Sequence, residues 1–292
     1  MSIYSFFYKY RVKIYNFFNI FIPLKNYSIS YFFSRFGNNL QQISIGILFS
    51  EVVKGNFYFK DHKYIDDFTI INNNFSNKLK IFKKHYRFFY FKEIQDFPSK
   101  LLTEKYVIDN IQDIFQKKLY NNISFLKENP VDVNTLVLHI RSGDIFTKPI
   151  KTYYQNPINF YKEILREYEK VVLVTSHENN NPIVKVLSKI KKITIQSSTL
   201  EEDFNLLVNA KNLATSGVGT FPIAAALLSK NLKNIYYTNL YSDEHLNPTM
   251  IKKDNVIHHK FEVDSNYKNA YLKEKNLESL ILNESINVYR LN

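Results

Sequence analysis

Apolar and polar positions alternate along the second half of this chain in a way that predicts strands and helices in turn. Short β-branched apolar runs, such as Leu136-Val137-Leu138, indicate buried strands, and apolar positions three or four residues apart indicate helices. The predicted strands cover residues 135–140, 171–175, 192–196, a short segment at Leu213, and 234–237. The predicted helices cover residues 157–169, a segment after Pro182, a segment around Asp203, and an alanine-rich run with Pro222 in its first turn. Strands that alternate with helices predict a parallel, doubly wound α/β sheet.

The first half shows the same kind of pattern with less regularity. A strand over 29–33, a turn, an apolar helix over 43–53 and a strand over 56–60 are predicted there. Residues 64–98 are aromatic and basic without a clean period, which predicts an irregular insertion. Helical spacing predicts a long helix within 101–127 that Asn129-Pro130 ends. In the polar carboxy-terminal segment we expect one final helix over 271–282.

The loop after the predicted strand at 135–140 carries the most informative motif, His139 to Asp144, with the sequence HIRSGD. In open α/β sheets, ligands bind at the carboxyl ends of the strands. An arginine there can hold phosphate oxygens with two parallel hydrogen bonds, which a lysine cannot do. The alternative is a strand end at which Arg141 and Asp144 pair with each other at the surface.

Two further segments combine a glycine-containing turn with the start of an apolar helix. They are Arg35 to Asn39, with the sequence RFGNN, and Ser216 to Phe221, with the sequence SGVGTF. Backbone N–H groups at such helix starts suit an anion. Ordinary turn and capping roles would also account for Asn38, Ser216 and Thr220.

Together with Glu202-Asp203-Phe204, these segments resemble the fucosyltransferase superfamily, which includes α-1,2-, α-1,6- and protein O-fucosyltransferases. The resemblance spans roughly residues 28–240, and the arginine motif is its most specific part. The chain departs from the family pattern at Asn39, where Gln is usual, and at Gly217-Val218-Gly219, where Ser or Asn is usual. The resemblance implies a GT-B-like α/β fold, in which two Rossmann-like domains face a cleft.

The same resemblance implies the activity, an inverting and metal-independent transfer of fucose from GDP-fucose to a glycan acceptor. The expected partners are therefore a nucleotide-sugar donor and a glycan, with no further cofactor. We expect four parts of the chain: an aromatic and basic segment (1–27), an acceptor-side α/β domain (28–130), a donor-binding α/β domain (131–245) and an extension that packs back on the body (246–292).

A leaving diphosphate accumulates negative charge, which cationic side chains and helix starts must stabilise when no metal does so. By resemblance, Arg141 grips the β-phosphate, and Asp203 accepts hydrogen bonds from the guanine edge. Gly37 and Asn38 close over the phosphates or the sugar from the other domain. The phosphate and base side of the pocket is lined by Ser216, Thr220 and Phe221.

Three residues of the HIRSGD motif form the predicted catalytic set, Arg141, His139 and Asp144. His139 either hydrogen-bonds the donor or orients the Arg141 loop. A carboxylate base for the acceptor hydroxyl stays open among Asp144, Glu51, Asp61 and Asp67.

No metal site is expected. The chain has no D-x-D motif, since Asp66 and Asp67 are adjacent. We interpret His258-His259 as a solvated pair, because neighbouring side chains diverge. The absence of cysteine excludes a disulfide framework and a cysteine-based metal site.

The net charge of +12 leaves two other functions open beside fucosyl transfer. One is transfer from a different nucleotide sugar, and the other is a non-enzymatic basic protein that binds nucleic acid or a membrane. Lysines are spread along the chain rather than gathered into one patch, so no nucleic-acid partner is expected. A positive field would also attract a nucleotide diphosphate.

The first 26 residues are aromatic and basic, and two interpretations of them stay open. They form a helix in a membrane interface, or they pack an apolar face on the first domain. The segment is too broken by charge for a signal peptide, and no run of ~18 apolar residues predicts a spanning helix. The expected location is therefore the cytoplasm, with peripheral contact at the inner membrane face under the first interpretation.

Overall fold

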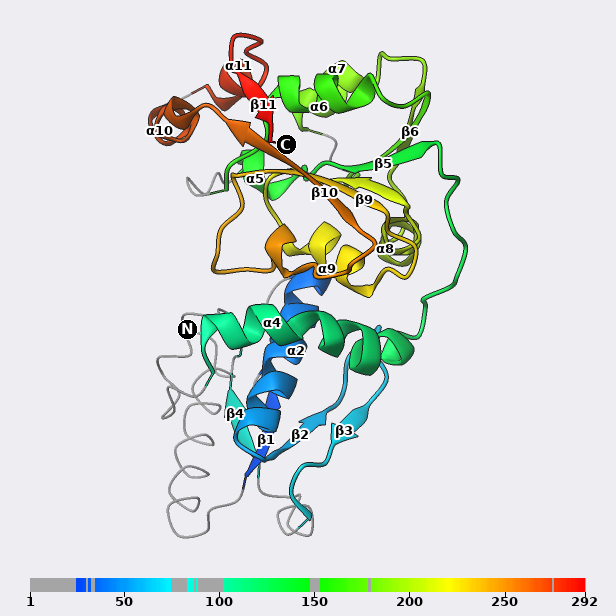
Figure 1. Ribbon diagram of the computed structural model, residues 1–292, viewed down its shortest axis with the longest axis vertical. Coiled ribbons are helices and arrows are strands. Elements are labelled where there is room, and N and C mark those ends of the chain that lie inside the picture. Colours follow the sequence, from blue (N-terminus) through cyan, green and yellow to red (C-terminus); the bar gives the residue numbers. More distant parts are fainter. Residues whose placement is uncertain are drawn as a thin grey trace. The chain divides into compact units, whose positions relative to one another are not determined.

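The computed structural model describes residues 25–29, 31–32, 35–74, 83–86, 88, 102–147, 153–177, 180–274 and 276–291. The chain divides into two compact units between Ser124 and Phe125, and each unit has its own sheet (Figure 1). The division lies six residues before the boundary predicted after residue 130. Residues beyond 245 belong to the second unit and contribute strands to its sheet. The expectation for residues 1–24 lies outside the described residues.

The first unit contains a four-stranded sheet in the order β3-β2-β1-β4. Strand β1 pairs in parallel with β2 and β4, whereas β2 and β3 are antiparallel. The described elements of this unit are β1 (Asn26–Ile29), α2 (Phe36–Val52), β2 (Asn56–Phe59), β3 (Phe68–Ile70), β4 (Lys84–Tyr86), α4 (Glu104–Ile114), the π-helical turn η2 (Phe115–Leu119) and the 3₁₀ turn η3 (Tyr120–Asn122).

Helix α2 is the centre of the first unit. It is buried from Phe36 to Ser50 except at Asn38, and it packs against β1, β2 and α4. Gly46 allows this close packing, because a Cβ atom there would lie 2.4 Å from the Phe57 ring on β2. Because nearly all of its side chains are buried, polar ones included, α2 forms the core of this unit.

The second unit contains a seven-stranded sheet in the order β11-β10-β9-β8-β5-β6-β7. All neighbouring pairs from β10 to β7 are parallel, and only β11 is antiparallel. The strands are β5 (Thr135–His139), β6 (Lys170–Val174), β7 (Ile193–Gln196), β8 (Asn212–Ala214), β9 (Asn234–Thr238), β10 (Ile257–Val263) and β11 (Val288–Arg290). The helices are α5 (Asp144–Thr147), α6 (Ile158–Leu165), α7 (Pro182–Leu187), α8 (Leu200–Val208), α9 (Thr220–Leu228), the 3₁₀ turn η4 (Pro248–Met250), α10 (Ser265–Lys273) and α11 (Leu277–Ile281).

The prediction of an α/β chain with a parallel sheet is confirmed by this unit. Helices cover both faces of its sheet, with α6 and α7 on one face and α8 and α9 on the other (Figure 1). On the α6 face, Leu136 and Leu138 of β5 join a core that includes Phe160 of α6 and Ile183 of α7. The opposite face is covered by the alanine-rich helix α9, whose side chains are buried from Pro222 to Leu228.

The strand order locates the place where a ligand would bind. From β5 the chain adds β6 and β7 on one side, and then returns to add β8, β9 and β10 on the other side. This is the order of doubly wound nucleotide-binding sheets, in which ligands bind at the carboxyl ends of the two strands where the direction reverses. In this sheet the two strands are β5 and β8, so the loops that follow His139 and Ala214 lie side by side.

Several predicted elements have wrong ends, and four strands were not predicted. Strand β1 ends at Ile29, where the predicted strand starts, and α2 begins at Phe36 rather than at residue 43. The final helix predicted over 271–282 is two helices, α10 and α11. The predictions missed the strands β3, β4, β10 and β11, which are short or polar and lie at or beside sheet edges, where a strand needs no continuous apolar run.

Candidate functional site

Two asparagines of the loop after β6 form hydrogen bonds with the backbone of the loop that carries Arg141. The Nδ2 group of Asn181 donates to the Arg141 carbonyl (2.9 Å), and the Gly143 N–H donates to Oδ1 of Asn180 (2.6 Å). The Nδ2 group of Asn180 in turn donates to the Gly143 carbonyl (3.2 Å). Gly143 has a φ of +84°, which favours glycine. The loop therefore has a defined backbone before any ligand arrives.

The turn between β8 and α9 depends on two glycines in the left-handed region. Gly217 has a φ of +79° and Gly219 a φ of +100°. A Cβ atom on Gly217 would lie 2.3 Å from Oδ1 of Asn156, so this position tolerates no side chain. These requirements explain why glycine stands at both positions, where the resemblance predicted Ser or Asn.

Asn156 is the buried residue that braces this turn. Its Nδ2 group donates to the Thr215 carbonyl (2.8 Å), and its Oδ1 accepts a hydrogen bond from the Thr238 hydroxyl on β9 (2.6 Å). Asn156 is fully buried, so loss of either bond would leave a polar group unsatisfied away from water. Asn156 was not predicted from the sequence, where its only local signal is that Pro157 follows it.

The guanidinium of Arg141 lies against this turn. Its Cζ is 5.0 Å from the centre of the Tyr153 ring, and its Nη1 is 3.7 Å from the position that a Cβ of Gly219 would occupy. The planar guanidinium therefore lies near the Tyr153 ring and near Gly219, which has no side chain to displace it. The structure thus brings Arg141 together with the Ser216–Thr220 turn, and it adds Tyr153, which the sequence analysis did not identify.

The remaining predicted residues of the α9 start have mainly internal contacts. The Ser216 hydroxyl donates to the Val218 carbonyl (2.9 Å), and Thr220 is the first, buried residue of α9. The centroid of the Phe221 ring lies 5.7 Å from that of the His139 ring and 5.0 Å from that of the Phe204 ring. His139 is itself 8% exposed. His139 and Phe221 therefore support the two loops from within the sheet edge.

Asp203 lies in the first turn of α8 and accepts hydrogen bonds from nearby residues of the same unit. Its Oδ1 accepts hydrogen bonds from the Gln196 side chain (3.0 Å) and from the Ser198 N–H (3.2 Å). Burial raises the pKa of this carboxyl, and the two hydrogen bonds partly oppose that shift. These hydrogen bonds use Oδ1 and leave the guanine contact that the resemblance implies untested.

Gly37 and Asn38 lie in the first unit, within the first turn of α2 rather than in a loop before it. The N-cap is Arg35, which has extended backbone and makes no capping hydrogen bond with its side chain. The next residue, Asn39, accepts at Oδ1 from His62 Nε2 (3.1 Å) in the loop after β2. This helix start is therefore fixed by a histidine that the sequence analysis did not single out.

The carboxylates considered as catalytic bases lie in different places. Glu51 is 14 residues beyond Gly37 on α2, which puts it about 21 Å away along the helix axis. Asp61 and Asp67 share the loop after β2, where the Asp61 N–H donates to Oδ1 of Asp67 (2.9 Å). Asp144 begins α5, and its side chain lies outside the described part of the structure.

His258 and His259 are both half-buried, so solvent reaches only part of each ring of the pair. The His259 ring stacks on Tyr236 (centroids 4.3 Å apart), and its Nε2 hydrogen-bonds Asn234 (2.8 Å). The His258 ring instead meets the edge of the Tyr237 ring, so the two side chains do diverge. Among the described residues, no group of three or more His, Cys, Asp or Glu is placed to hold a metal ion.

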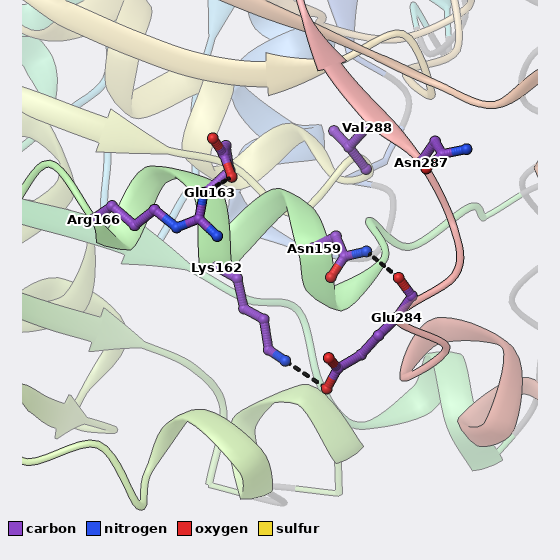
Figure 2. A pocket seen from close by; sticks show the side chains of 7 residues that line it. All are labelled: Asn159, Lys162, Glu163, Arg166, Glu284, Asn287 and Val288. Carbon is purple, nitrogen blue, oxygen red and sulfur yellow. Dashed lines mark hydrogen bonds and ion pairs between the residues drawn. The ribbon is translucent and has the colours of Figure 1, made fainter.

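A polar hollow of about 360 Å³ lies between α6 and the segment that leads into β11 (Figure 2). Within it Lys162 pairs with Glu284 and Arg166 with Glu163, so its charges are compensated by one another. The residues that line it are Asn159, Lys162, Glu163, Arg166, Glu284, Asn287 and Val288, none of which the sequence analysis selected.

No helix in the described ranges has the length and apolar character needed to cross a membrane. Comparisons of this chain with protein-family models, with curated proteins and with solved structures found no match. In the second sheet, the Arg141 loop and the Gly217–Gly219 turn meet at the carboxyl ends of β5 and β8.

Proposed function

We propose that this protein is a glycosyltransferase that binds a nucleotide sugar through the Arg141 loop and the Gly217–Gly219 turn. One observation carries the proposal: the guanidinium of Arg141 lies beside Gly219 where the sheet order reverses. That place combines a cation, a glycine turn without side chains and the first N–H groups of α9. These are the groups that a diphosphate needs in the absence of a metal.

The reaction that the resemblance implies is an inverting transfer, and these groups would serve its leaving group. An oxygen of the acceptor hydroxyl attacks the anomeric carbon of the donor sugar and forms the new glycosidic bond. The bond between that carbon and the β-phosphate oxygen breaks, and its electron pair stays on the departing nucleoside diphosphate. The acceptor proton leaves to a base or to water. Arg141 stabilises the charge that develops on the leaving phosphate, which is where electrostatic catalysis has its effect.

Fucose from GDP-fucose is the donor that the resemblance of the HIRSGD motif implies, and we propose it first. The Gly217-Val218-Gly219 turn, which departs from the family pattern, favours a second candidate, transfer from a different nucleotide sugar. The hydrogen bonds that Asp203 accepts from Gln196 and Ser198 do not by themselves select a base. The phosphate site is common to both candidates, and the base and the sugar distinguish them.

The proposal includes the two-domain GT-B arrangement, with the second unit on the donor side and the first on the acceptor side. Its support is that each unit has a mainly parallel sheet with helices packed on it. A crystal structure with bound GDP would test this part, because contacts from both units to one nucleotide are expected.

A thermal-shift panel of nucleotides tests the function directly. Stabilisation by GDP supports fucosyl transfer, and stabilisation by UDP, CMP or dTDP supports the second candidate. Product formation from the matching nucleotide sugar, with EDTA present, then tests the transfer and its metal independence. Loss of activity on chelation that Mn²⁺ restores would overturn the metal-independent mechanism. If no nucleotide binds and RNA or vesicles bind tightly, the proposal of an enzyme is overturned, and a non-enzymatic basic binding protein is favoured.

A further inference from the structure

A short segment just before α6, residues 153–156, connects helix α10 with the Arg141 site. Each of its residues contacts either α10 or one of the two loops that meet at the carboxyl ends of β5 and β8. Residues beyond 245 were expected to pack back on the body, and no role in the site was predicted for them. The 153–156 segment gives α10 a physical connection to that site.

Helix α10 holds the backbone of this segment through two tyrosine hydroxyls. The Tyr271 hydroxyl donates to the Tyr153 carbonyl (3.0 Å), and the Tyr267 hydroxyl donates to the Gln155 carbonyl (2.7 Å). Tyr267 and Tyr271 are buried and stand four residues apart, so they lie on the same face of the helix. The Tyr154 ring meets the edge of the Tyr271 ring, with centroids 5.4 Å apart. The segment is therefore attached to α10 at successive residues.

These two hydroxyls are protonated at neutral pH, as donors must be. Burial raises the pKa of Tyr271 to about 12, and it raises the pKa of Tyr267 well above the ordinary value of tyrosine. Without the Tyr271 hydroxyl, the Tyr153 carbonyl would keep a longer contact with Nε2 of Gln155 (3.5 Å). Since a buried carbonyl that loses its donor is costly, the hydroxyls favour one backbone position of the segment.

The other side of the segment contacts the site. The Tyr153 ring centre lies 5.0 Å from Cζ of Arg141. Three residues later, the Asn156 N–H donates to the Ser216 carbonyl (3.4 Å), and the Asn156 side chain donates to the Thr215 carbonyl (2.8 Å). The same segment thus contacts the guanidinium and the turn before α9. Where the Tyr153 ring lies depends on the backbone that Tyr271 holds.

We infer that α10 positions the Arg141 guanidinium for a diphosphate through the 153–156 segment, with Tyr271 and Tyr153 as positioning residues. The inference rests on the proposed function for the identity of the ligand, whereas the placement of the guanidinium can be measured without a ligand. A bidentate phosphate contact requires the planar guanidinium in one orientation. A ring fixed beside it supplies part of that orientation before the anion binds.

The side-chain N–H signal of Arg141 in a ¹H–¹⁵N spectrum of the full chain measures this placement, because an aromatic ring shifts the signals of nearby protons. The spectrum is recorded at mildly acidic pH, where exchange with water is slow. Arg141→Lys lacks the signal and identifies it, and Tyr153→Leu shows its position without the ring. In Tyr271→Phe the signal should move towards its position in Tyr153→Leu. It should move further in the double variant that also carries Tyr267→Phe.

Calorimetric titration with GDP and with inorganic pyrophosphate measures the consequence for binding. Tyr153→Leu should bind both anions about tenfold more weakly, and Tyr271→Phe about threefold. Tyr153→Phe keeps the ring and should recover most of the affinity lost in Tyr153→Leu. Tyr168→Phe is the matched control, because it also loses a tyrosine hydrogen bond, to the Tyr236 hydroxyl (2.7 Å), but stands just before the amino end of β6. Its Arg141 signal and its affinities should equal those of the wild type.

The outcomes separate this inference from the proposed function. An Arg141 signal that stays in place in Tyr271→Phe and in the double variant overturns the inference and leaves the proposed function intact. An equal shift in Tyr168→Phe, or unchanged affinities despite a shifted signal, also overturns it. If the signal moves as expected but the wild type binds neither pyrophosphate nor any nucleotide, the placement of the guanidinium by α10 stands, and the proposed function fails.

Discussion

Two helices of this protein follow a strand and a glycine-containing turn in sequence, and they begin in different ways. At α9, Gly219 is the N-cap with a φ of +100°, and the turn lies against the Arg141 guanidinium. At α2, the N-cap is Arg35, and Gly37 lies inside the first helical turn. Glycine is thus a conformational requirement at α9 and an ordinary helical residue at α2. The same sequence signature can therefore mark a turn that requires glycine or only a helix start.

The two starts are also held by different chemistry. The α9 turn is braced by the amide of Asn156, which does not titrate. The α2 start is braced by His62, whose Nδ1 accepts from the Tyr64 N–H (3.2 Å), so that Nε2 carries the proton donated to Asn39. Aromatic side chains surround this neutral imidazole, with the Phe32 ring 4.6 Å away. Protonation would break the His62 pattern and leave the Asn156 pattern intact.

Arg141→Lys should have the largest effect on function. It keeps the charge beside Gly219 and loses the bidentate contact, which costs about 2–4 kcal/mol of transition-state stabilisation, or about 30- to 1000-fold in kcat/KM. The melting temperature should change little. Arg166→Lys, at an exposed position paired with Glu163, is the matched control. Transfer at the wild-type rate in Arg141→Lys would show that the α9 turn is no phosphate site.

Gly217→Ala should be the largest destabilisation. Its methyl group meets Oδ1 of Asn156 at 2.3 Å and its backbone is held at positive φ, which together cost about 2–4 kcal/mol. Urea unfolding of Gly217→Ala, Asn156→Ala and the double variant measures the coupling between them. Because Asn156→Ala removes the oxygen that the methyl group meets, the double variant should be more stable than the sum of the single changes predicts. Additive costs would mean that Asn156 does not brace the turn.

Gly37→Ala should change stability in the opposite direction. In a helical position alanine is preferred over glycine by about 0.5–1 kcal/mol, so the first unit should become slightly more stable. Gly46→Ala on the same helix is the contrast, because its Cβ would lie 2.4 Å from the Phe57 ring and should destabilise. Melting curves of the two variants measure the difference. A Gly37→Ala variant as unstable as Gly217→Ala would remove the distinction between the two helix starts.

Lowering the pH should loosen α2 and leave the α9 turn unchanged. Burial lowers the pKa of His62, so below its unfolded value of about 6.5 the unfolded chain binds the proton more readily than the folded one does. Stability is therefore lost as the pH falls from about 6.5 towards the folded pKa. Hydrogen exchange can be measured at pH 7 and pH 5 and corrected for intrinsic rates. Protection over residues 36–42 should be weaker at pH 5 than at pH 7, and protection over residues 215–222 should be the same at both. His62→Gln should reduce this pH dependence, and an unchanged dependence in that variant would contradict the assignment.

The sequence by itself determined the elements that a short apolar pattern can specify. The strands β5, β6, β7, β8 and β9 and the helices between them follow from runs of Val, Ile, Leu and Ala, because burial on both faces requires such runs. The position of Arg141 just after β5 followed from the same pattern. The strands at or beside the sheet edges and the first turn of α2 were not predicted, since β10 has polar residues such as His258 and Lys260, and the first turn of α2 contains Gly37 and Asn38.

Only the tertiary structure decided what surrounds Arg141. Gly219 follows it by 78 residues, and their contact exists because β8 pairs with β5 rather than with β7. Tyr153 and Asn156 reach the site from the segment just before α6, and no local pattern marks them. Local propensity acts over a few residues, whereas strand order depends on how whole faces of the sheet are buried. For that reason the chemistry of the motif was visible in the sequence, and its neighbours became visible only in the fold.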